Sequence, residues 1–366
     1  MSTIVDIARV AGVSVQTVSA VINDKAGISE ATRARIRQII KEFDYQPNQL
    51  ASSLRSKRTR TIGILVPSIT NPYWPEMVRG AEDVAHREGY VVFLCNTDGD
   101  QTKLDTYIRA LRRQRVAGLF FTGGGEIAIA EIAALVAGGV HLALNESRSR
   151  HEKVVTVHVD DHRAGYDATE HLLDLGHRRI GVIAPLDTAG AGRRAGYRTA
   201  LGEWGISVDP ELMIPAAFDM ESGQSGARRL LALATSPTAI VAGNDMIAIG
   251  VISTLKQQGK RVPEDVAVIG VDNIPMAALY DPPLTTIAQP LYEMGASAMQ
   301  AILDRVRNPA LPGVALTFAT PLIVRRSTVA TAITEEEPQP GAAPDTRTPG
   351  PGAERPPVLY EEVSMK

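Results

Sequence analysis

Residues 4–19 read IVDIARVAGVSVQTVS, and their spacing is that of two short helices joined by a tight turn, a helix-turn-helix. Thr3 is placed to cap the first helix, and Ser14 is placed to cap the second. Gly12 comes between them, where the turn requires a left-handed backbone. With a third helix capped by Ser29, the helices are expected over residues 4–11, 15–22 and 30–43. This stretch therefore predicts a small all-α head.

The second helix of such a motif presents its first side chains to the major groove of DNA. Gln16 can hydrogen-bond to adenine, and Thr17 can reach a phosphate or a base. Val15 or Ala20 can contact a thymine methyl group. A three-helix module that binds another protein is the alternative for the head taken alone.

Residues 45–55, YQPNQLASSLR, are helical in spacing but polar on most sides. A helix this short does not hold alone in water, so a segment that folds only against DNA fits this pattern. Leu50 and Leu54 are neighbours on one helical face and could provide a dimer contact and a minor-groove wedge. Basic side chains suited to phosphate contact follow at Arg55, Lys57, Arg58 and Arg60. A solvated linker is the alternative.

From Thr61 the pattern changes to short apolar runs that alternate with helical segments, which is typical of parallel sheets covered by helices on both faces. Strands are expected over residues 61–66, 91–96, 118–122, 141–145, 155–159, 179–183, 239–242 and 266–271. Helices are expected over residues 75–88, 103–113, 126–137, 162–175, 192–204, 222–234 and 246–258. These alternating strand and helix units are more than one sheet usually holds, so we expect two lobes. The last helix, 291–305, and the last strand, 322–325, are expected to cross back between them.

Charge divides along the chain in the same way. The 366 residues carry a net charge of −3, which argues weakly against a nucleic-acid partner. Residues 1–60, however, hold 10 Lys and Arg against 5 Asp and Glu, whereas residues 61–366 hold 28 against 36. A basic head on an acidic body indicates a nucleic-acid-binding end. The expected domains are a helix-turn-helix domain (1–46), a hinge helix and linker (47–60), an effector-binding and dimerisation body (61–330) and a tail (331–366).

The composition of the tail, the length of the apolar runs and the cysteine count indicate what kind of protein this is and where it is located. Residues 338–357 contain 7 Pro and 3 Gly, a composition typical of a disordered, passive segment. No apolar run reaches the roughly 18 residues that span a bilayer, and Asp6 and Arg9 interrupt any signal peptide. The single Cys95 excludes an internal disulfide and fits a reducing compartment. We therefore expect a cytoplasmic protein without a membrane partner.

The head resembles the LacI/GalR family of bacterial transcriptional regulators. The matching stretches of the head and hinge lie at 6–8, 11–14, 17–19, 21–23, 45–48 and 51–54. The resemblance continues through the body at 62–63, 71–73, 175–177, 193–197, 244–245, 270–273 and 283–287, and so covers roughly residues 3–328. Ala20 departs from the family, since many relatives carry Arg or His there to read a base. Alanine donates no hydrogen bond, so the operator half-site is expected to differ at that position.

The resemblance implies a homodimer whose two heads read a near-palindromic double-stranded operator. It implies a repressor controlled allosterically by a small molecule, a sugar or sugar derivative with a nucleobase or nucleoside as the alternative. We expect no C-terminal helix bundle that would make a tetramer. The expected DNA contacts are Thr3, Ser14, Val15, Gln16, Thr17, Ser19, Ala20, Asn23, Asn48, Ala51, Leu54 and Arg55.

Candidate effector-binding residues follow the predicted strands, because ligands of open α/β sheets lie beyond the carboxyl ends of the strands. Those at strand ends are Asn71, Tyr73, Asn145, Asp160 and Asp272. Trp74 adds a flat aromatic face beside Tyr73. By resemblance, Arg193, Phe218, Asn244 and Gln289 also align with effector-contacting positions. Each polar side chain taken singly also fits a helix cap or a loop hydrogen bond.

Two rival classes, an enzyme and a transport-type sugar-binding protein, share parts of this pattern. The run 123–128, GGGEIA, contains a G-x-G-x-x-A after a strand, the pattern of a nucleotide-binding enzyme. It follows the third strand of the body, whereas a Rossmann fold carries it after the first, and the sequence holds no hydrolase, metalloprotease or P-loop motif. A transport-type sugar-binding protein would share the two lobes but lack the head. We therefore expect no catalysis, no cofactor and no metal.

Overall fold

The computed structural model describes residues 3–22, 24–45, 59–145 and 151–329. The chain divides into two compact units, residues 1–59 and residues 60–366. The first unit contains the helices α1 (Ile4–Ala11), α2 (Val15–Ile22) and α3 (Glu30–Glu42). These bounds agree with the predicted helices to within one residue.

The helices of the head begin where short polar side chains accept backbone hydrogen bonds. Thr3 and Asp6 form a reciprocal capping box at the start of α1. Ser14 Oγ accepts from the Thr17 N–H at 3.1 Å, and Ser29 Oγ accepts from the Thr32 N–H at 3.3 Å. Gly12 ends α1 with φ +62°, the left-handed conformation that its position predicts. All three predicted caps are therefore confirmed.

The core of the head is small and comes from all three helices. Its buried members are Ile7, Ala8, Ala11, Val18, Val21, Ile36 and Ile39. Ala8 and Ala11 have small side chains, which allows α1 and α2 to lie close together. So few apolar side chains make each one important to the stability of the head.

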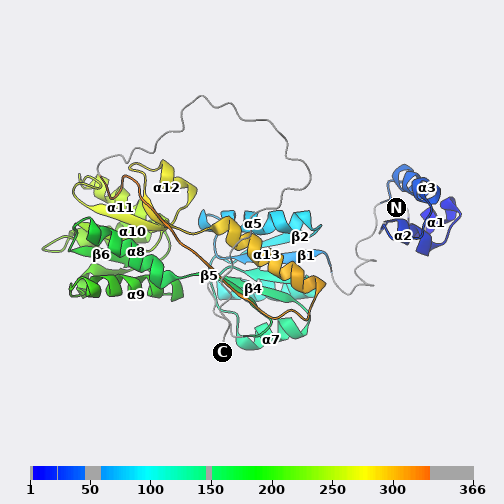
Figure 1. The fold of residues 1–366 in the computed structure, drawn as a ribbon, viewed down its shortest axis with the longest axis horizontal. Coiled ribbons are helices and arrows are strands. Elements are labelled where there is room, and N and C mark those ends of the chain that lie inside the picture. Colours follow the sequence, from blue (N-terminus) through cyan, green and yellow to red (C-terminus); the bar gives the residue numbers. More distant parts are fainter. Residues whose placement is uncertain (1–2, 23, 46–58, 146–150, 330–366) are drawn as a thin grey trace, which may run out of the picture. The chain divides into compact units, whose positions relative to one another are not determined.

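The first lobe of the body is a six-stranded parallel sheet with the order β11-β5-β4-β3-β1-β2. Its strands are β1 (Thr61–Val66), β2 (Val91–Asn96), β3 (Gly118–Phe121), β4 (His141–Asn145), β5 (Val155–Val159) and β11 (Ala315–Phe318). Its helices are α5 (Tyr73–Arg87), α6 (Gln101–Arg113), α7 (Ile129–Ala137) and α13 (Leu291–Arg307). Figure 1 shows α5 and α13 against this sheet.

The second lobe is another six-stranded sheet, with the order β12-β10-β9-β8-β6-β7. Its strands are β6 (Ile180–Ala184), β7 (Met213–Pro215), β8 (Ala239–Ala242), β9 (Ala267–Asp272), β10 (Thr285–Ala288) and β12 (Leu322–Ile323). Its helices are α8 (Asp161–Asp174), α9 (Thr188–Glu203), α10 (Met220–Leu231), α11 (Asp245–Gln257), α12 (Pro275–Leu279) and a 3-10 turn at Pro210–Leu212. The strand β12 pairs antiparallel with β10, whereas the other strand pairs of the sheet are parallel. Three short strands, β7, β10 and β11, were not predicted.

The chain passes between the two sheets of the body three times. It leaves the first sheet after β5 for α8, returns after β10 to α13, and leaves again after β11 for β12. The predicted return of the last helix and last strand is therefore confirmed. These connections place Asp160 and Gln289 in crossover segments.

The contact between α5 and α13 depends on two glycines. A Cβ at Gly80 would collide with the backbone oxygen of Tyr292, and a Cβ at Gly295 would collide with that of Met77. The two helices therefore touch backbone to backbone, and this fixes α5, which begins at the site residue Tyr73.

Several predicted segments lie outside the described residues. They are the hinge, with Asn48, Leu50, Ala51, Leu54 and Arg55, the turn residue Asn23, and the tail from residue 331. Within the described ranges no single helix has the length and apolarity of a membrane span. The helices α1 and α2 taken together are long and apolar enough by length and composition alone, but the pair is sharply bent.

Candidate functional site

The first turns of α2 carry the predicted DNA-reading side chains. Gln16 is exposed, whereas Val15 is half-buried and packs partly against the core of the head. Ala20 lies one turn after Gln16, so the two share a face of the helix. The hydroxyl groups of Ser14 and Thr17 lie 2.9 Å apart and hydrogen-bond to each other. Gln16 is therefore the long polar side chain that this helix offers to a partner.

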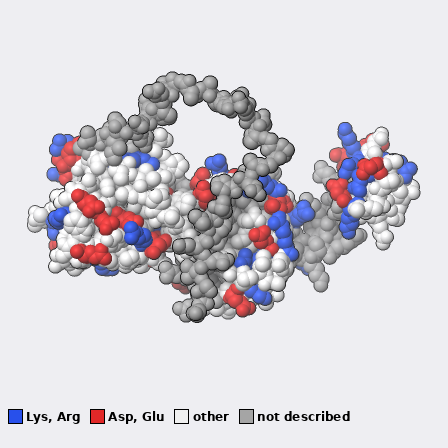
Figure 2. Space-filling view, in the orientation of Figure 1, with Lys and Arg blue, Asp and Glu red and all other residues white. Residues whose placement is uncertain are grey.

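The other described candidates in the head have structural contacts as well. Thr3 and Ser14 cap α1 and α2, as shown above. Ser19 is half-buried on α2. Basic and acidic side chains are interspersed on the face of the head drawn in Figure 2. Arg33 and Arg37 both pair with Asp24.

In the body, Arg193 is the centre of a buried polar cluster at the carboxyl edge of the second sheet. Its side chain is 3% exposed. Its Nε donates to Asp161 Oδ1 at 3.0 Å, and its Nη1 donates to the Gly243 carbonyl. The Phe218 ring lies 5.8 Å from the guanidinium carbon, within the range of a cation–π contact. The structure therefore brings together two of the predicted residues, Arg193 and Phe218.

Asp161 is a partner of this site that the sequence did not reveal. Burial raises the pKa of its carboxyl, and the Arg193 guanidinium opposes that rise. The neighbouring carboxylates of Asp187 and Asp160 raise the pKa further, so all three acids lie near one another. No local motif marks Asp161, because its partner is 32 residues away in the sequence.

A second chain of hydrogen bonds joins the two lobes. The Tyr73 hydroxyl, on α5 of the first lobe, donates to Gln289 Oε1 at 3.2 Å. Gln289 Nε2 in turn donates to Asp272 Oδ1, at the end of β9 in the second lobe, at 2.8 Å. Asp272 adopts φ +123°, a conformation that costs a non-glycine residue free energy and that the surrounding contacts must hold. The predicted residues Tyr73, Gln289 and Asp272 therefore form one connected group.

Asn145 has an acceptor without a partner in the part of the chain that the structure describes. Its side chain is 1% exposed at the end of β4. Its Nδ2 donates to the Thr122 carbonyl at 3.2 Å, while its Oδ1 accepts no hydrogen bond there. A buried amide oxygen without a hydrogen-bond donor costs free energy.

The remaining polar candidates accept hydrogen bonds from backbone N–H groups at or near the starts of helices. Asp160 accepts from the Arg163 N–H at the start of α8, and Asn244 accepts from the Ile247 N–H at the start of α11, both at 2.9 Å. Asp187, which was not predicted, accepts from the Gly190 N–H at 2.8 Å and caps α9. Asn71 accepts from the Tyr73 N–H at 3.1 Å. Each cap uses only part of the acceptor capacity of its side chain.

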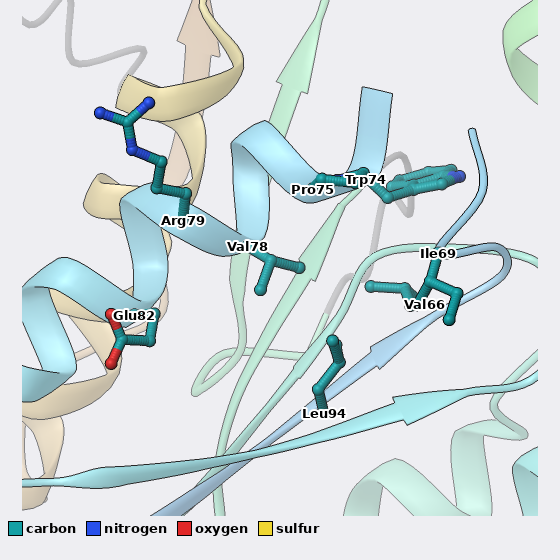
Figure 3. A pocket seen from close by; sticks show the side chains of 8 residues that line it. All are labelled: Val66, Ile69, Trp74, Pro75, Val78, Arg79, Glu82 and Leu94. Carbon is teal, nitrogen blue, oxygen red and sulfur yellow. The ribbon is translucent and has the colours of Figure 1, made fainter. Parts of the chain in front are cut away.

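Trp74 lies edge to face with Tyr73, with ring centroids 4.5 Å apart. It also lines an apolar pocket of about 350 Å³ in the first lobe, between α5 and β2 (Figure 3). The pocket is lined by Val66, Ile69, Trp74, Pro75, Val78, Arg79, Glu82 and Leu94. None of the other predicted effector residues lines this described pocket, so Trp74 connects the site to a different surface.

The glycine run that suggested an enzyme has a different geometry from a nucleotide-binding loop. Gly123, Gly124 and Gly125 all have positive φ, but α7 begins only at Ile129. The glycines therefore do not open directly into a helix N-terminus, which dinucleotide binding requires. Over the described ranges no group of three or more His, Cys, Asp or Glu side chains could hold a metal ion.

A capped helix-turn-helix ahead of a two-lobed α/β body with a polar cluster at its strand ends defines the class of ligand-responsive DNA-binding regulators. Residues 3–48 match the bacterial regulatory proteins of the lacI family, and residues 169–328 match the periplasmic binding protein-like domain. The chain belongs to the lacI family of bacterial regulatory proteins, and it is a DNA-binding regulator of transcription.

Relatives and solved structures cover most of the chain. The ribose operon repressor of Escherichia coli (strain K12) is 37% identical over 342 residues, 89% of this chain and 99% of the relative. The lac repressor dimer, solved with operator and the anti-inducer ONPF, superposes with a TM-score of 0.78 at 26% identity, covering 89% of this chain and 99% of that chain. A LacI family regulator from Enterococcus faecium, solved with bound ribose, superposes with a TM-score of 0.67 at 33% identity. The match covers 73% of this chain and 98% of that chain.

Proposed function

We propose that the chain is a repressor that binds a near-palindromic operator as a homodimer and is controlled by a sugar. The observation that carries this proposal is the head, in which a capped helix-turn-helix exposes Gln16 on its second helix. That helix has the form which enters the major groove in DNA-binding proteins of this type. No catalysed reaction is part of the proposal, and its setting is the cytoplasm.

In this proposal Gln16 reads adenine through a bidentate hydrogen bond. Ala20, on the same face of α2, contacts a thymine methyl group where other family members place a base-reading Arg or His. Phosphate and further base contacts come from the other side chains named for the head: Thr3, Ser14, Val15, Thr17, Ser19 and Asn23. By family resemblance, Asn48, Ala51, Leu54 and Arg55 of the hinge bind the minor groove, with Leu54 as the wedge.

The face formed by α5 and β2 supports the dimer. β2 is an edge strand, and its Phe93 and Leu94 are 43% and 48% exposed. Ile69 is exposed beside the apolar pocket of Figure 3. An exposed apolar face beside an uncovered sheet edge is typical of an interaction surface. The lac repressor in the solved complex is a dimer, and a dimer through this face would present two heads to two half-sites.

The effector site is proposed at the carboxyl edges of the two sheets. Its members are Asn71, Tyr73, Trp74, Asn145, Asp160, Arg193, Phe218, Asn244, Asp272 and Gln289. Carboxylates, amides and a guanidinium are the groups that bracket adjacent hydroxyls, and aromatic faces suit a sugar ring. Ribose is bound by one solved family member, which supports a sugar. A nucleobase is the second candidate, and the three aromatic side chains are the feature that favours it.

Coupling between the site and DNA would run through the hydrogen bonds of Tyr73, Gln289 and Asp272. A ligand that competes for Asp272 or Gln289 changes the link between the lobes, and Tyr73 begins the helix α5 of the dimer face. A shift of that face would change the spacing of the two hinge segments. Such coupling is reciprocal, so an effector that weakens operator binding is itself bound more weakly in the presence of operator.

Selection from a random double-stranded DNA pool by the full-length chain tests the proposed function. We expect enrichment of a near-palindromic sequence, and Gln16→Ala should lose most of the preference at one position in each half-site. Gln38→Ala changes the same residue type on α3 and is the control. Recovery of an unselected pool by the folded wild-type chain would refute the proposed function.

A further inference from the structure

We infer that the effector is a neutral, donor-rich molecule, the free form of a sugar rather than its phosphate ester. This inference rests on the proposed effector site and concerns the charge of the ligand that the site accepts. It follows from three features of the described residues: the surplus of acceptors, the internal pairing of the one buried guanidinium of the cluster, and the carboxylates at the helix starts.

Acceptors outnumber donors in the cluster. Asp160 brings a carboxylate for which one described hydrogen bond, from the Arg163 N–H, uses only part of the acceptor capacity. Asn145 brings a buried amide oxygen that accepts nothing within the described ranges. An acceptor-rich site is satisfied by a ligand that donates, and each sugar hydroxyl carries a donor. A phosphate group near neutral pH carries acceptor oxygens and is therefore a poor match.

The cationic group of the cluster already has its counter-charge. Arg193 Nε lies 3.0 Å from Asp161 Oδ1 in a pair whose side chains are 3% and 19% exposed. Asp160 and Asp187 add further negative charge near Asp161: burial raises the pKa of the Asp161 carboxyl, and these two carboxylates raise it further. An anionic ligand would therefore meet several like charges and one cation that is already neutralised.

The helix starts do not compensate for these charges. The N-termini of α8, α9 and α11 carry the positive ends of the helix dipoles, which commonly bind phosphate. Here a side chain of the protein caps each start: Asp160 on α8, Asp187 on α9 and Asn244 on α11. Two of the three caps are carboxylates, so the place that a phosphate would take at α8 and α9 is held by a negative side chain.

Isothermal titration of the full-length chain tests the inference with matched probes. A panel of pentoses and hexoses is titrated beside the phosphate ester of each, beginning with D-ribose and D-ribose 5-phosphate. We expect one neutral sugar to bind and its phosphate ester to bind about 100-fold more weakly or not at all. Equal or tighter binding of an ester, binding by no neutral sugar, or binding of a purine base alone would each overturn the inference.

Charge-removing variants separate this explanation from a simple steric one. Asn caps a helix as well as Asp does, so Asp160→Asn combined with Asp187→Asn keeps both caps and removes two negative charges. The ratio of the affinity for the neutral sugar to the affinity for its phosphate ester should fall by about tenfold or more in the double variant. Asp174→Asn removes a charge from the far end of α8 and should leave the preference unchanged. An unchanged preference in the double variant would contradict the charge argument.

Failure of this inference and failure of the proposed function have different signatures. A chain that selects a DNA sequence and binds a phosphorylated sugar contradicts only the inference. A chain that binds a neutral sugar and selects no DNA sequence contradicts the proposed function.

Discussion

In the head, the side chain proposed to read adenine, Gln16, is separate from the side chains that form the core. Val18 and Val21 of α2 are buried, while Gln16 on the same helix is exposed. In the body, the proposed effector residues Arg193 and Asp272 are themselves buried and hydrogen-bonded. We therefore expect that DNA reading can be changed at Gln16 without loss of stability, whereas changes at Arg193 or Asp272 should alter ligand recognition and stability together.

The largest expected effect comes from the core of the head. Ile36→Ala should lower the free energy of unfolding of the head by about 2–5 kcal/mol, because Ile36 is fully buried in a core of few residues. DNA binding should be lost, while sugar binding by the body should persist. Ile40→Ala, at a half-buried position of α3, is the milder control. Loss of sugar binding together with DNA binding in titrations of Ile36→Ala would show that the head and the body do not fold independently.

Next in size is the effect of Arg193→Ala in the body. It removes a proposed ligand contact and leaves Asp161 buried without its cation, at a cost of about 3–5 kcal/mol in stability. Sugar affinity and the melting temperature should both fall. Adding Asp161→Ala should restore part of the stability but not the affinity. Arg198→Ala, at an exposed position of α9, should change neither quantity. Full sugar affinity in Arg193→Ala would remove this residue from the site.

A smaller and purely functional effect is expected for Gln16→Ala. Operator affinity should fall by about 1–3 kcal/mol, the value of one bidentate base contact. The unfolding curve should match that of the wild type, since the side chain is exposed. Fluorescence anisotropy of a labelled duplex and thermal melting measure the two quantities. A destabilised head would show that folding and DNA reading are not separate there.

The smallest effect is expected for Tyr73→Phe, which removes the hydroxyl that donates to Gln289 across the lobes. The loss of one hydrogen bond should change sugar affinity by about 0.5–1.5 kcal/mol and should alter the response of DNA binding to sugar. Tyr292→Phe removes a similar bond, to Asp83, within the first lobe and should leave that response intact. Equal responses in the two variants would show that the link between the lobes has no regulatory role.

The sequence predicted the head almost completely because its signals are local. Thr3, Gly12 and Ser14 each act on residues within one or two helical turns. The strands β1 and β4 of the body were predicted for the same reason, since each contains an uninterrupted run without polar side chains, at residues 62–66 and 142–144. Three strands were missed, and two of them have evident reasons. β11 pairs with β5 across more than 150 residues, and β7 has only three residues.

The site was predictable by position but not by contact. Strand ends indicated Asn145 and Asp272, because parallel strands bring their carboxyl ends to one edge. The pairing of Arg193 with Asp161 and the bond from Tyr73 to Gln289 join segments 32 and 216 residues apart. Tertiary packing alone creates such contacts, so periodicity and spacing carry no signal for them.

The central claim is that a small molecule bound in the body controls sequence-specific DNA binding by the head. Fluorescence anisotropy of the selected duplex, titrated with the full-length chain with and without the sugar that binds, tests it most directly. We expect the sugar to change duplex affinity by about 5- to 150-fold, and the duplex to change sugar affinity by the same factor. Identical duplex affinity at saturating sugar, or equal affinity for a scrambled duplex, would contradict the account.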